Sequence, residues 1–232
     1  MIHLVTGAGS GIGAELATRL HERGDGLVLV ARSDARAEEL AAAHPGAATL
    51  VADLADPTGL ERALAETALP ERLDSLVHVA GVVELGPVGE LGLPQWRSQL
   101  DVNLTAPFLL TRALLPALRA ARGQVVFVNS GAGLAAHAWW AGYAASKFGL
   151  RALADALRSE EQERDVRVTT VFPGRVATPM QEKVHRQEGR EYDAGAWIRP
   201  ETVADLIRHV LDLPRDATVP EVRISPTPGQ TS

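Results

Sequence analysis

The chain has 232 residues, a net charge of −6 and a hydrophobic fraction of 46%, which is typical of a globular protein with one core. The acidic balance argues against a nucleic-acid partner, and the absence of cysteine excludes disulfides, thiolate zinc sites and cysteine nucleophiles. No apolar run is long enough to span a membrane, and no secretory leader precedes the first strand-like residues, Ile2–Thr6. We therefore expect a cytoplasmic protein without a membrane partner.

Short apolar segments alternate along the chain with longer amphipathic ones. The expected strands are Ile2–Thr6, Leu27–Ala31, Ala48–Ala52, Ser75–Val79, Gln124–Asn129, Val166–Phe172 and Glu221–Ser225. The expected helices are Gly11–Arg23, Ala35–Ala43, Pro57–Thr67, Pro94–Ala121, Tyr143–Glu163 and Pro200–Leu213. Several strands are apolar throughout, which is typical of parallel strands that are covered on both faces. The alternation predicts an α/β fold: a Rossmann-like, doubly wound parallel sheet of about seven strands between two helix layers.

We expect a single domain over residues 1–225, because no linker or repeat interrupts the pattern. Residues 226–232 are polar and rich in proline and glycine, so we expect a frayed tail there. The segment Thr178–Arg199 is polar and weakly periodic, which predicts a functional loop or lid rather than a core element.

A glycine-rich segment joins the first expected strand to the first expected helix. It reads Thr6-Gly7-Ala8-Gly9-Ser10-Gly11-Ile12-Gly13. Glycines permit a tight turn and close approach to a ligand, and the helix N-terminus offers free N–H groups to a pyrophosphate. This position, at the carboxyl end of a strand, predicts a dinucleotide-binding loop. No Gly-Lys-Ser/Thr follows, which disfavours an ATP-binding loop.

The residues after the second expected strand bear on the choice between NADP(H) and NAD(H). The strand ends at neutral Ala31, followed by Arg32 and Ser33, and Arg36 lies about one helical turn later. Arginine at this place suits a 2′-phosphate. Asp34 supports the competing NAD(H) interpretation, or else caps the following helix. We favour NADP(H) and keep NAD(H) as the alternative.

Tyr143 and Lys147 are four residues apart on an expected helix, which places them one turn apart on the same face. A free tyrosine titrates at about 10, and a nearby ammonium lowers that pKa, so the phenol can exchange protons. Ser130 ends an apolar strand, where a hydroxyl can hold a substrate oxygen. Together the three residues predict acid/base chemistry on a carbonyl or alcohol.

These motifs together resemble the short-chain dehydrogenase/reductase family, in its compact single-domain form, over nearly the whole chain. The resemblance rests on the glycine loop, Asp53, Ala80-Gly81, Asn103, Ser130, the Tyr143–Lys147 pair, and Pro173-Gly174 with Thr178. It implies an NAD(P)(H)-dependent oxidoreductase that interconverts a carbonyl compound and a secondary alcohol, as a ketoreductase does.

The resemblance also implies a role for individual residues. Tyr143 would exchange the proton, Lys147 would lower its pKa and bind the nicotinamide ribose, and Ser130 would orient the substrate oxygen. Asn103 would support a water-linked proton relay to Lys147. The expected cofactor contacts are Thr6, Gly7, Gly9, Ser10, Gly11, Ile12, Gly13, Arg32, Ser33, Asp53, Leu54, Ala80, Gly81, Pro173, Gly174, Val176 and Thr178. Asp53 would accept a hydrogen bond from adenine; a simple loop carboxylate is the equally open alternative.

One departure from the family pattern concerns the residues before Ala80-Gly81. The family has Asn-Asn there, whereas this chain has His78-Val79. Because Val79 makes no side-chain hydrogen bonds, we expect a repacked local network with catalysis retained. No ligand cluster accompanies His78, so we expect no metal site.

The family places its substrate between the loop after Ser130 and the segment after Pro173-Gly174. The expected substrate contacts are Leu134, His137, Trp139, Trp140 and Met180, with Tyr192 and Trp197 nearby. Such walls predict a fairly apolar small-molecule carbonyl or alcohol. The alternative is that some of these aromatic residues pack between subunits.

The expected helices Pro94–Ala121 and Tyr143–Glu163 resemble those that pair in the family's oligomers, which implies a homodimer or homotetramer. Pro107 and Pro116 should kink or interrupt the first of them. Three other functions compete with the oxidoreductase: a non-catalytic dinucleotide-binding sensor, a nucleotide-sugar epimerase and a methyltransferase. The sensor and the methyltransferase do not require the serine, tyrosine and lysine together, and the epimerases resemble longer chains.

Overall fold

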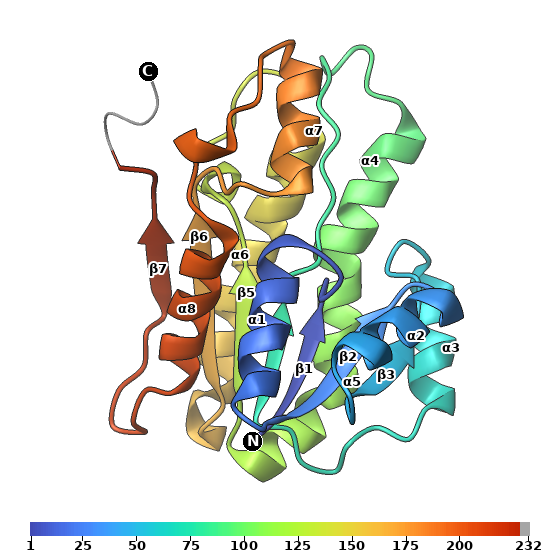
Figure 1. Ribbon diagram of the computed structural model, residues 1–232, viewed down its shortest axis with the longest axis vertical. Helices are drawn as coiled ribbons and strands as arrows, with labels where there is room; N and C mark the ends of the chain where they lie inside the picture. The colour runs from blue at the N-terminus through green and yellow to red at the C-terminus, as the bar shows by residue number, and fades with distance from the viewer. Residues whose placement is uncertain (228–232) are drawn as a thin grey trace.

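The computed structural model describes residues 1–227 and contains a seven-stranded parallel sheet in the order β3-β2-β1-β4-β5-β6-β7 (Figure 1). The strands are β1 Ile2–Thr6, β2 Gly26–Ala31, β3 Ala48–Val51, β4 Ser75–His78, β5 Gln124–Val128, β6 Arg167–Pro173 and β7 Glu221–Ile224. All of their pairings are parallel. The predicted doubly wound fold is therefore confirmed.

Helices cover both faces of the sheet. They are α1 Gly11–Glu22, α2 Asp34–Ala43, α3 Pro57–Glu66, α4 Leu93–Leu100, α5 Ala106–Ala121, α6 Ala141–Glu161, α7 Pro179–Glu188 and α8 Pro200–Leu211. Helices α1, α2 and α8 contribute to the core on one face, and α3, α5 and α6 to the core on the other. In Figure 1, α1 and α8 lie in front of the sheet, with α5 and α6 behind it.

Two adjacent residues of β1 show why this strand is apolar throughout. Leu4 packs into one core and Val5 into the other, and both are completely buried. Successive side chains point to opposite faces of a strand, so a sheet covered on both faces requires apolar residues at consecutive positions. Strand β1 also pairs with β2 on one side and β4 on the other, so the strand order reverses there. Open α/β sheets bind ligands beside such a reversal.

The expected long helix over residues 94–121 is divided in two. A π-helical turn, Asp101–Thr105, separates α4 from α5. Pro107 has no N–H to donate to the carbonyl of Asn103, which removes a normal helical hydrogen bond at this point. The irregularity expected near Pro107 takes the form of this π-helical turn just before it. At Pro116 the prediction was wrong, because α5 continues through that residue without a break.

The expected loop over residues 178–199 contains a helix, so that prediction was wrong for its first half. Helix α7 begins after Thr178, whose hydroxyl accepts a hydrogen bond from the backbone N–H of Gln181. It ends at Gly189, which adopts the left-handed conformation with φ of 67°. Only Gln181, Val184 and His185 are buried, so the helix has almost no apolar periodicity in the sequence.

Within the part of the chain that the structure describes, no helix combines the length and apolar character needed to cross a membrane. Of the tail that we expected to fray, residues 228–232 lie outside the described residues.

Candidate active site

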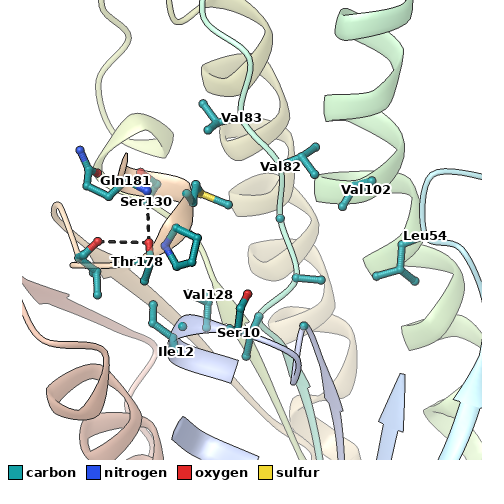
Figure 2. Close-up of a pocket in the computed structure, with 18 of the residues that line it drawn as sticks. Ser10, Ile12, Leu54, Val82, Val83, Val102, Val128, Ser130, Thr178 and Gln181 are labelled. Atoms are coloured by element: carbon teal, nitrogen blue, oxygen red, sulfur yellow. Dashed lines mark hydrogen bonds between the residues drawn. The ribbon is translucent and has the colours of Figure 1, made fainter. Parts of the chain in front are cut away.

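A cavity of about 1420 Å³ lies at the carboxyl edge of the sheet. It is lined by the loops that follow β1 to β6 and by the inner face of α7. Figure 2 shows Ser10 below the cavity, Thr178 and Gln181 on one side, and Val82 and Val102 on the opposite side. Pockets for small ligands usually measure roughly 300–1000 Å³, so this one has room for a longer molecule.

Most of the site residues that we predicted from the sequence line this cavity. They are Gly7, Gly9, Ser10, Gly11, Ile12, Arg32, Ser33, Asp53, Leu54, Ala80, Gly81, Ser130, His137, Trp140, Tyr143, Lys147, Pro173, Gly174, Val176, Thr178 and Met180. The predicted site residues outside the lining, over residues 1–227, are Thr6, Gly13, Asn103, Leu134, Trp139, Tyr192 and Trp197.

The loop after β1 requires glycine for steric reasons. Gly7 and Gly11 have φ of 72° and 53°, a region that other residues rarely adopt. A Cβ on Gly13 would lie 2.2 Å from the carbonyl oxygen of Gly7, so this glycine allows α1 to pack against the loop. Gly7, Gly9 and Gly11 face the cavity, whereas Gly13 lies behind it.

The start of α1 fits the diphosphate of a dinucleotide. Ser10 is the N-cap residue, but among the described residues its side chain makes no capping hydrogen bond, and the first turn carries no acidic side chain. The first N–H groups of α1 are therefore available at the positive end of the helix dipole. Such an end binds phosphate groups.

Thr6 holds the backbone where the family pattern is interrupted. Its hydroxyl oxygen accepts hydrogen bonds from the N–H groups of Val79, at 3.0 Å, and Ala80, at 3.1 Å. Thr6 is 1% exposed. These bonds fix the strand end without a side-chain amide at Val79, and they place Thr6 behind the loop rather than in the cavity.

His78 is buried and neutral. Its Nε2 is 3.0 Å from the hydroxyl of Thr111, and its ring stacks on Phe127 with centroids 4.9 Å apart. Burial, aided by the charge of Lys147, lowers the pKa of His78 to about 3. The ring therefore acts as a packing residue between β4, β5 and α5.

The residues that follow β2 present two arginines and one glutamate to the cavity. Arg32, Ser33 and Arg36 line it, as does Glu39, which forms an ion pair with Arg36. Arg36 also donates a hydrogen bond to the carbonyl oxygen of Gly9, in the glycine loop. Ser33, not Asp34, caps α2, because its hydroxyl accepts from the N–H of Arg36.

Asp53 and Leu54 line the cavity just beyond β3. One carboxylate oxygen of Asp53 accepts a hydrogen bond from the N–H of Ala55, at 2.9 Å. The carboxylate therefore shapes its own loop, and its exposed face remains available to a ligand.

Ser130, Tyr143 and Lys147 meet at the carboxyl end of β5. Ser130 and Tyr143 line the cavity together, and the Ser130 hydroxyl is close enough to lower the proton affinity of the phenol. The Lys147 Nζ lies 5.7 Å from the centroid of the Tyr143 ring and donates to the carbonyl oxygen of Val128 at 3.0 Å. The predicted i, i+4 pair therefore reaches the same wall of the cavity as the serine.

Asn129 supports this group, and the sequence reasoning missed it. Its Oδ1 accepts from the N–H of Ser130 at 2.8 Å, and its Nδ2 donates to the carbonyl of Lys147 at 3.0 Å. Asn129 thus ties the serine loop to α6. The signal available in the sequence was a buried amide directly before the serine at a strand end.

Burial governs proton affinity at this site. It raises the pKa of Tyr143 to about 12, against the opposing effect of the neighbouring Ser130 hydroxyl. It lowers the pKa of Lys147 to about 8. The expectation that Lys147 lowers the pKa of Tyr143 is not met in this structure: desolvation of the phenolate is the largest effect, and the opposing effect comes from Ser130.

Asn103 lies in the π-helical turn and is completely buried. Its amide donates to the carbonyl of Val82 and to the hydroxyl of Ser146, both at 2.9 Å, and its Oδ1 accepts from the N–H of Val82. Ser146 directly precedes Lys147 on α6. Asn103 therefore joins the loop after β4 to the helix that carries Lys147.

An apolar chamber surrounds Tyr143. Val83, Ala132 and Val184 form a buried cluster with it, and Trp140 and Met180 pack against that cluster. The Trp140 ring meets the Tyr143 ring edge-on, with centroids 5.7 Å apart.

The other aromatic residues nominated for the substrate side lie elsewhere. Trp139 is 52% exposed, with φ of 74°, and its carbonyl accepts from the N–H of Gly86. Trp197 and Tyr192 pack on His185 beneath α7. Trp140 is thus the tryptophan that lines the cavity.

Over residues 1–227, no group of three or more histidine and acidic side chains is placed to hold a metal ion. Ser130, Tyr143 and Lys147 offer proton exchange and hydrogen bonding, beside a cradle for phosphate groups at the start of α1.

Comparison with known proteins identifies relatives over most of the chain. An uncharacterized short-chain type dehydrogenase/reductase of Sinorhizobium fredii is 32% identical, covering 97% of this chain and 91% of that protein. The D-threitol dehydrogenase of Mycolicibacterium smegmatis is 38% identical, covering 78% of this chain and 72% of that protein.

A solved structure, the closed form of a serine dehydrogenase complexed with NADP+, superposes with a TM-score of 0.84 at 26% identity. It covers 97% of this chain and 94% of that one. The sequence model of the short chain dehydrogenase family matches residues 1–189. The chain belongs to the short-chain dehydrogenase family.

Proposed function

We propose that the protein is an NADP(H)-dependent oxidoreductase that interconverts a carbonyl compound and a secondary alcohol, with Tyr143 as the general acid/base. The observation that carries the proposal is the position of Tyr143 and Ser130. Both line one continuous cavity, which runs from the glycine loop to the apolar chamber. A substrate oxygen at the Tyr143 hydroxyl would lie beside the cradle that fits a dinucleotide.

The residues of this chain divide the chemistry among them. A bound nicotinamide dinucleotide supplies or accepts the hydride. The Ser130 side chain holds the substrate oxygen next to Tyr143, which keeps its proton at neutral pH because its pKa is about 12. Tyr143 donates that proton to the oxygen during carbonyl reduction and takes it back during alcohol oxidation. Lys147 would bind the nicotinamide ribose, and Val184 and Met180 exclude water around the reacting oxygen.

The end of β2 supports NADP(H) over NAD(H). Arg32 and Arg36 can neutralise a 2′-phosphate, and the Ser33 hydroxyl lies between them in the chain. Asp34, on which the NAD(H) alternative depends, does not line the cavity within the described residues. The serine dehydrogenase structure, which shares the fold, contains NADP+.

The chamber around Tyr143 supports an apolar substrate. Val83, Ala132 and Val184 present only carbon atoms next to the tyrosine ring, with Trp140 on its edge. We infer a ketone or secondary alcohol with an apolar substituent, and thus ketoreductase activity.

Exposed apolar side chains on α5 and α6, the two helices expected to pair between subunits, support a homo-oligomer. Phe108 on α5 and Phe148 on α6 are each 43% exposed. Light scattering on a sizing column tests the expected dimer or tetramer, and a monomer at micromolar concentration contradicts it.

Titration with NADPH and with NADH, followed by a panel of ketones, tests the proposal as a whole. We expect saturable NADPH binding, seen by nicotinamide fluorescence, and oxidation of NADPH with apolar ketones. Binding without turnover in either direction across the panel would instead favour a dinucleotide sensor. If neither cofactor bound, the proposal would be wrong.

A further inference from the structure

Helix α7 separates the substrate end of the cavity from solvent. Met180, Gln181 and Val184 line the cavity from this helix. Glu182 and Arg186, which pair with each other on the same helix, are at least half exposed. The position of α7 therefore sets the size of the chamber around Tyr143, and whatever holds the helix in place controls access to that chamber.

Glu84, in the loop after β4, holds α7 through its carboxylate. One oxygen pairs with the ammonium of Lys183, and the other accepts a hydrogen bond from Gln187 Nε2 at 2.7 Å. The backbone N–H of Glu84 donates to Gln99 Oε1 on α4 at 3.0 Å. Glu84 thus connects α7, whose own interior contacts are few, to the fixed body of the protein.

A neighbouring contact extends this connection to the backbone. The N–H of Leu85 donates to Gln187 Oε1 at 3.2 Å. At the C-terminal end of α7, Arg175 forms a two-bond ion pair with Glu188, at 2.7 and 2.9 Å. The helix is therefore tied at its end by Arg175 and along its length by Glu84.

We propose that Glu84 is a positioning residue that holds α7 closed over the substrate chamber and thereby lowers the KM for the carbonyl substrate. The statement about the KM rests on the proposed function, whereas the statement that Glu84 holds α7 does not. Glu84 does not line the cavity among the described residues, so it acts through Met180 and Val184 on α7 rather than by touching the substrate.

The exposure of this ion pair makes the connection sensitive to salt. The side chains of Lys183 and Glu84 are 38% and 32% exposed. At 1 M ionic strength the screening length falls to about 3 Å, which weakens the attraction between such charges. High salt should therefore raise the KM of the wild-type protein more than that of a variant without the charge on Glu84.

Amide hydrogen exchange followed by NMR tests the tether without any turnover. In Glu84→Gln, which keeps the size and removes the charge, we expect the protection of the Leu85 amide to fall about tenfold. The Val82 amide is the internal reference, because it is bonded to Asn103 Oδ1 away from α7. Glu182→Gln is the matched control, since it makes the same change on the solvent side of α7 and should leave Leu85 unaffected.

The kinetic arm uses NADPH and a ketone that the wild-type protein reduces. In Glu84→Gln we expect KM to rise about fivefold with kcat within twofold, whereas Glu182→Gln changes neither. The charge swap Glu84→Lys with Lys183→Glu should recover part of both the KM and the Leu85 protection.

Unchanged Leu85 protection in Glu84→Gln, or an equal loss in Glu182→Gln, overturns the proposal. Faster exchange of the Leu85 amide in Glu84→Gln together with an unchanged KM also overturns the proposal. If the wild-type protein reduced no ketone, the proposed function and the KM statement would both fail, and the exchange comparison would still decide whether Glu84 holds α7.

Discussion

Two buried clusters of polar side chains lie at opposite edges of the same sheet. At the carboxyl edge, Ser130 and Tyr143 lie side by side in the lining of the large cavity. At the amino edge, His3 Nδ1 is 2.6 Å from the hydroxyl of Ser75, and His3 Nε2 is 3.5 Å from a carboxylate oxygen of Asp25. Each cluster joins a serine to a titratable ring.

The difference between them is access to a ligand. Ser75 and His3 are each 1% exposed and do not line the cavity within the described residues, although serine, histidine and aspartate together have the composition of a hydrolytic triad. Tyr143 and Ser130 face a space that a substrate can enter. Residue type alone therefore does not identify an active site in this protein; position on the sheet does.

The sharpest test of the carboxyl-edge cluster is Tyr143→Phe. The substitution removes the hydroxyl that exchanges the proton but keeps the ring in its apolar cluster. We expect kcat to fall about 10³-fold. Turnover is measured from the nicotinamide absorbance, and NADPH affinity should stay within twofold. If Tyr143→Phe retained turnover, the carboxyl-edge cluster would not be the catalytic one, and the comparison with the amino-edge cluster would fail.

The second test concerns cofactor preference, which we assign to the arginines that line the cavity after β2. Arg32→Ala should weaken NADPH binding about tenfold and leave NADH nearly unchanged, because only NADPH carries the 2′-phosphate. Arg36→Ala should act in the same direction. Fluorescence titration with both cofactors measures the two constants, and an equal loss for both refutes the role of these arginines.

Ser75→Ala probes the amino-edge cluster. It leaves Nδ1 of the buried His3 without its partner, so we expect the free energy of unfolding to fall by about 1–2 kcal/mol. Because the cluster has no access to ligand, kcat/KM should stay within twofold of the wild-type value. Urea unfolding and steady-state kinetics give both numbers. A large loss of turnover in a folded variant would mean that the two clusters are coupled.

The smallest expected effect concerns acid stability. Burial lowers the pKa of His3 below its ordinary value of 6.5, although Asp25 opposes this. The unfolded chain therefore binds the proton first, and stability present above pH 6.5 is lost as the pH falls below it, by at most about 1.4 kcal/mol per pH unit. His3→Gln should show a shallower loss between pH 6.5 and 5 in urea unfolding. The same slope in both proteins would contradict the lowered pKa.

The parts of the molecule that could be predicted from the sequence follow from local backbone chemistry. The two-sided strands, the glycine loop and the one-turn spacing of Tyr143 and Lys147 each depend on neighbours in the chain. Because the carboxyl ends of parallel strands share an edge, those local features also predicted that Ser130 and the glycine loop would face one site.

What only the tertiary structure decided depends on segments far apart in the chain. Helix α7 has too little apolar periodicity to be seen in the sequence, and it contacts Glu84, which lies 99 residues before Lys183 in the chain. The pKa of Tyr143 was expected to fall beside Lys147, but burial raises it to about 12. Burial depends on how the whole chain packs. The desolvation of a charged group can change its pKa more than a neighbouring ammonium does. For that reason the sequence determined which groups meet, and the packing determined how they titrate.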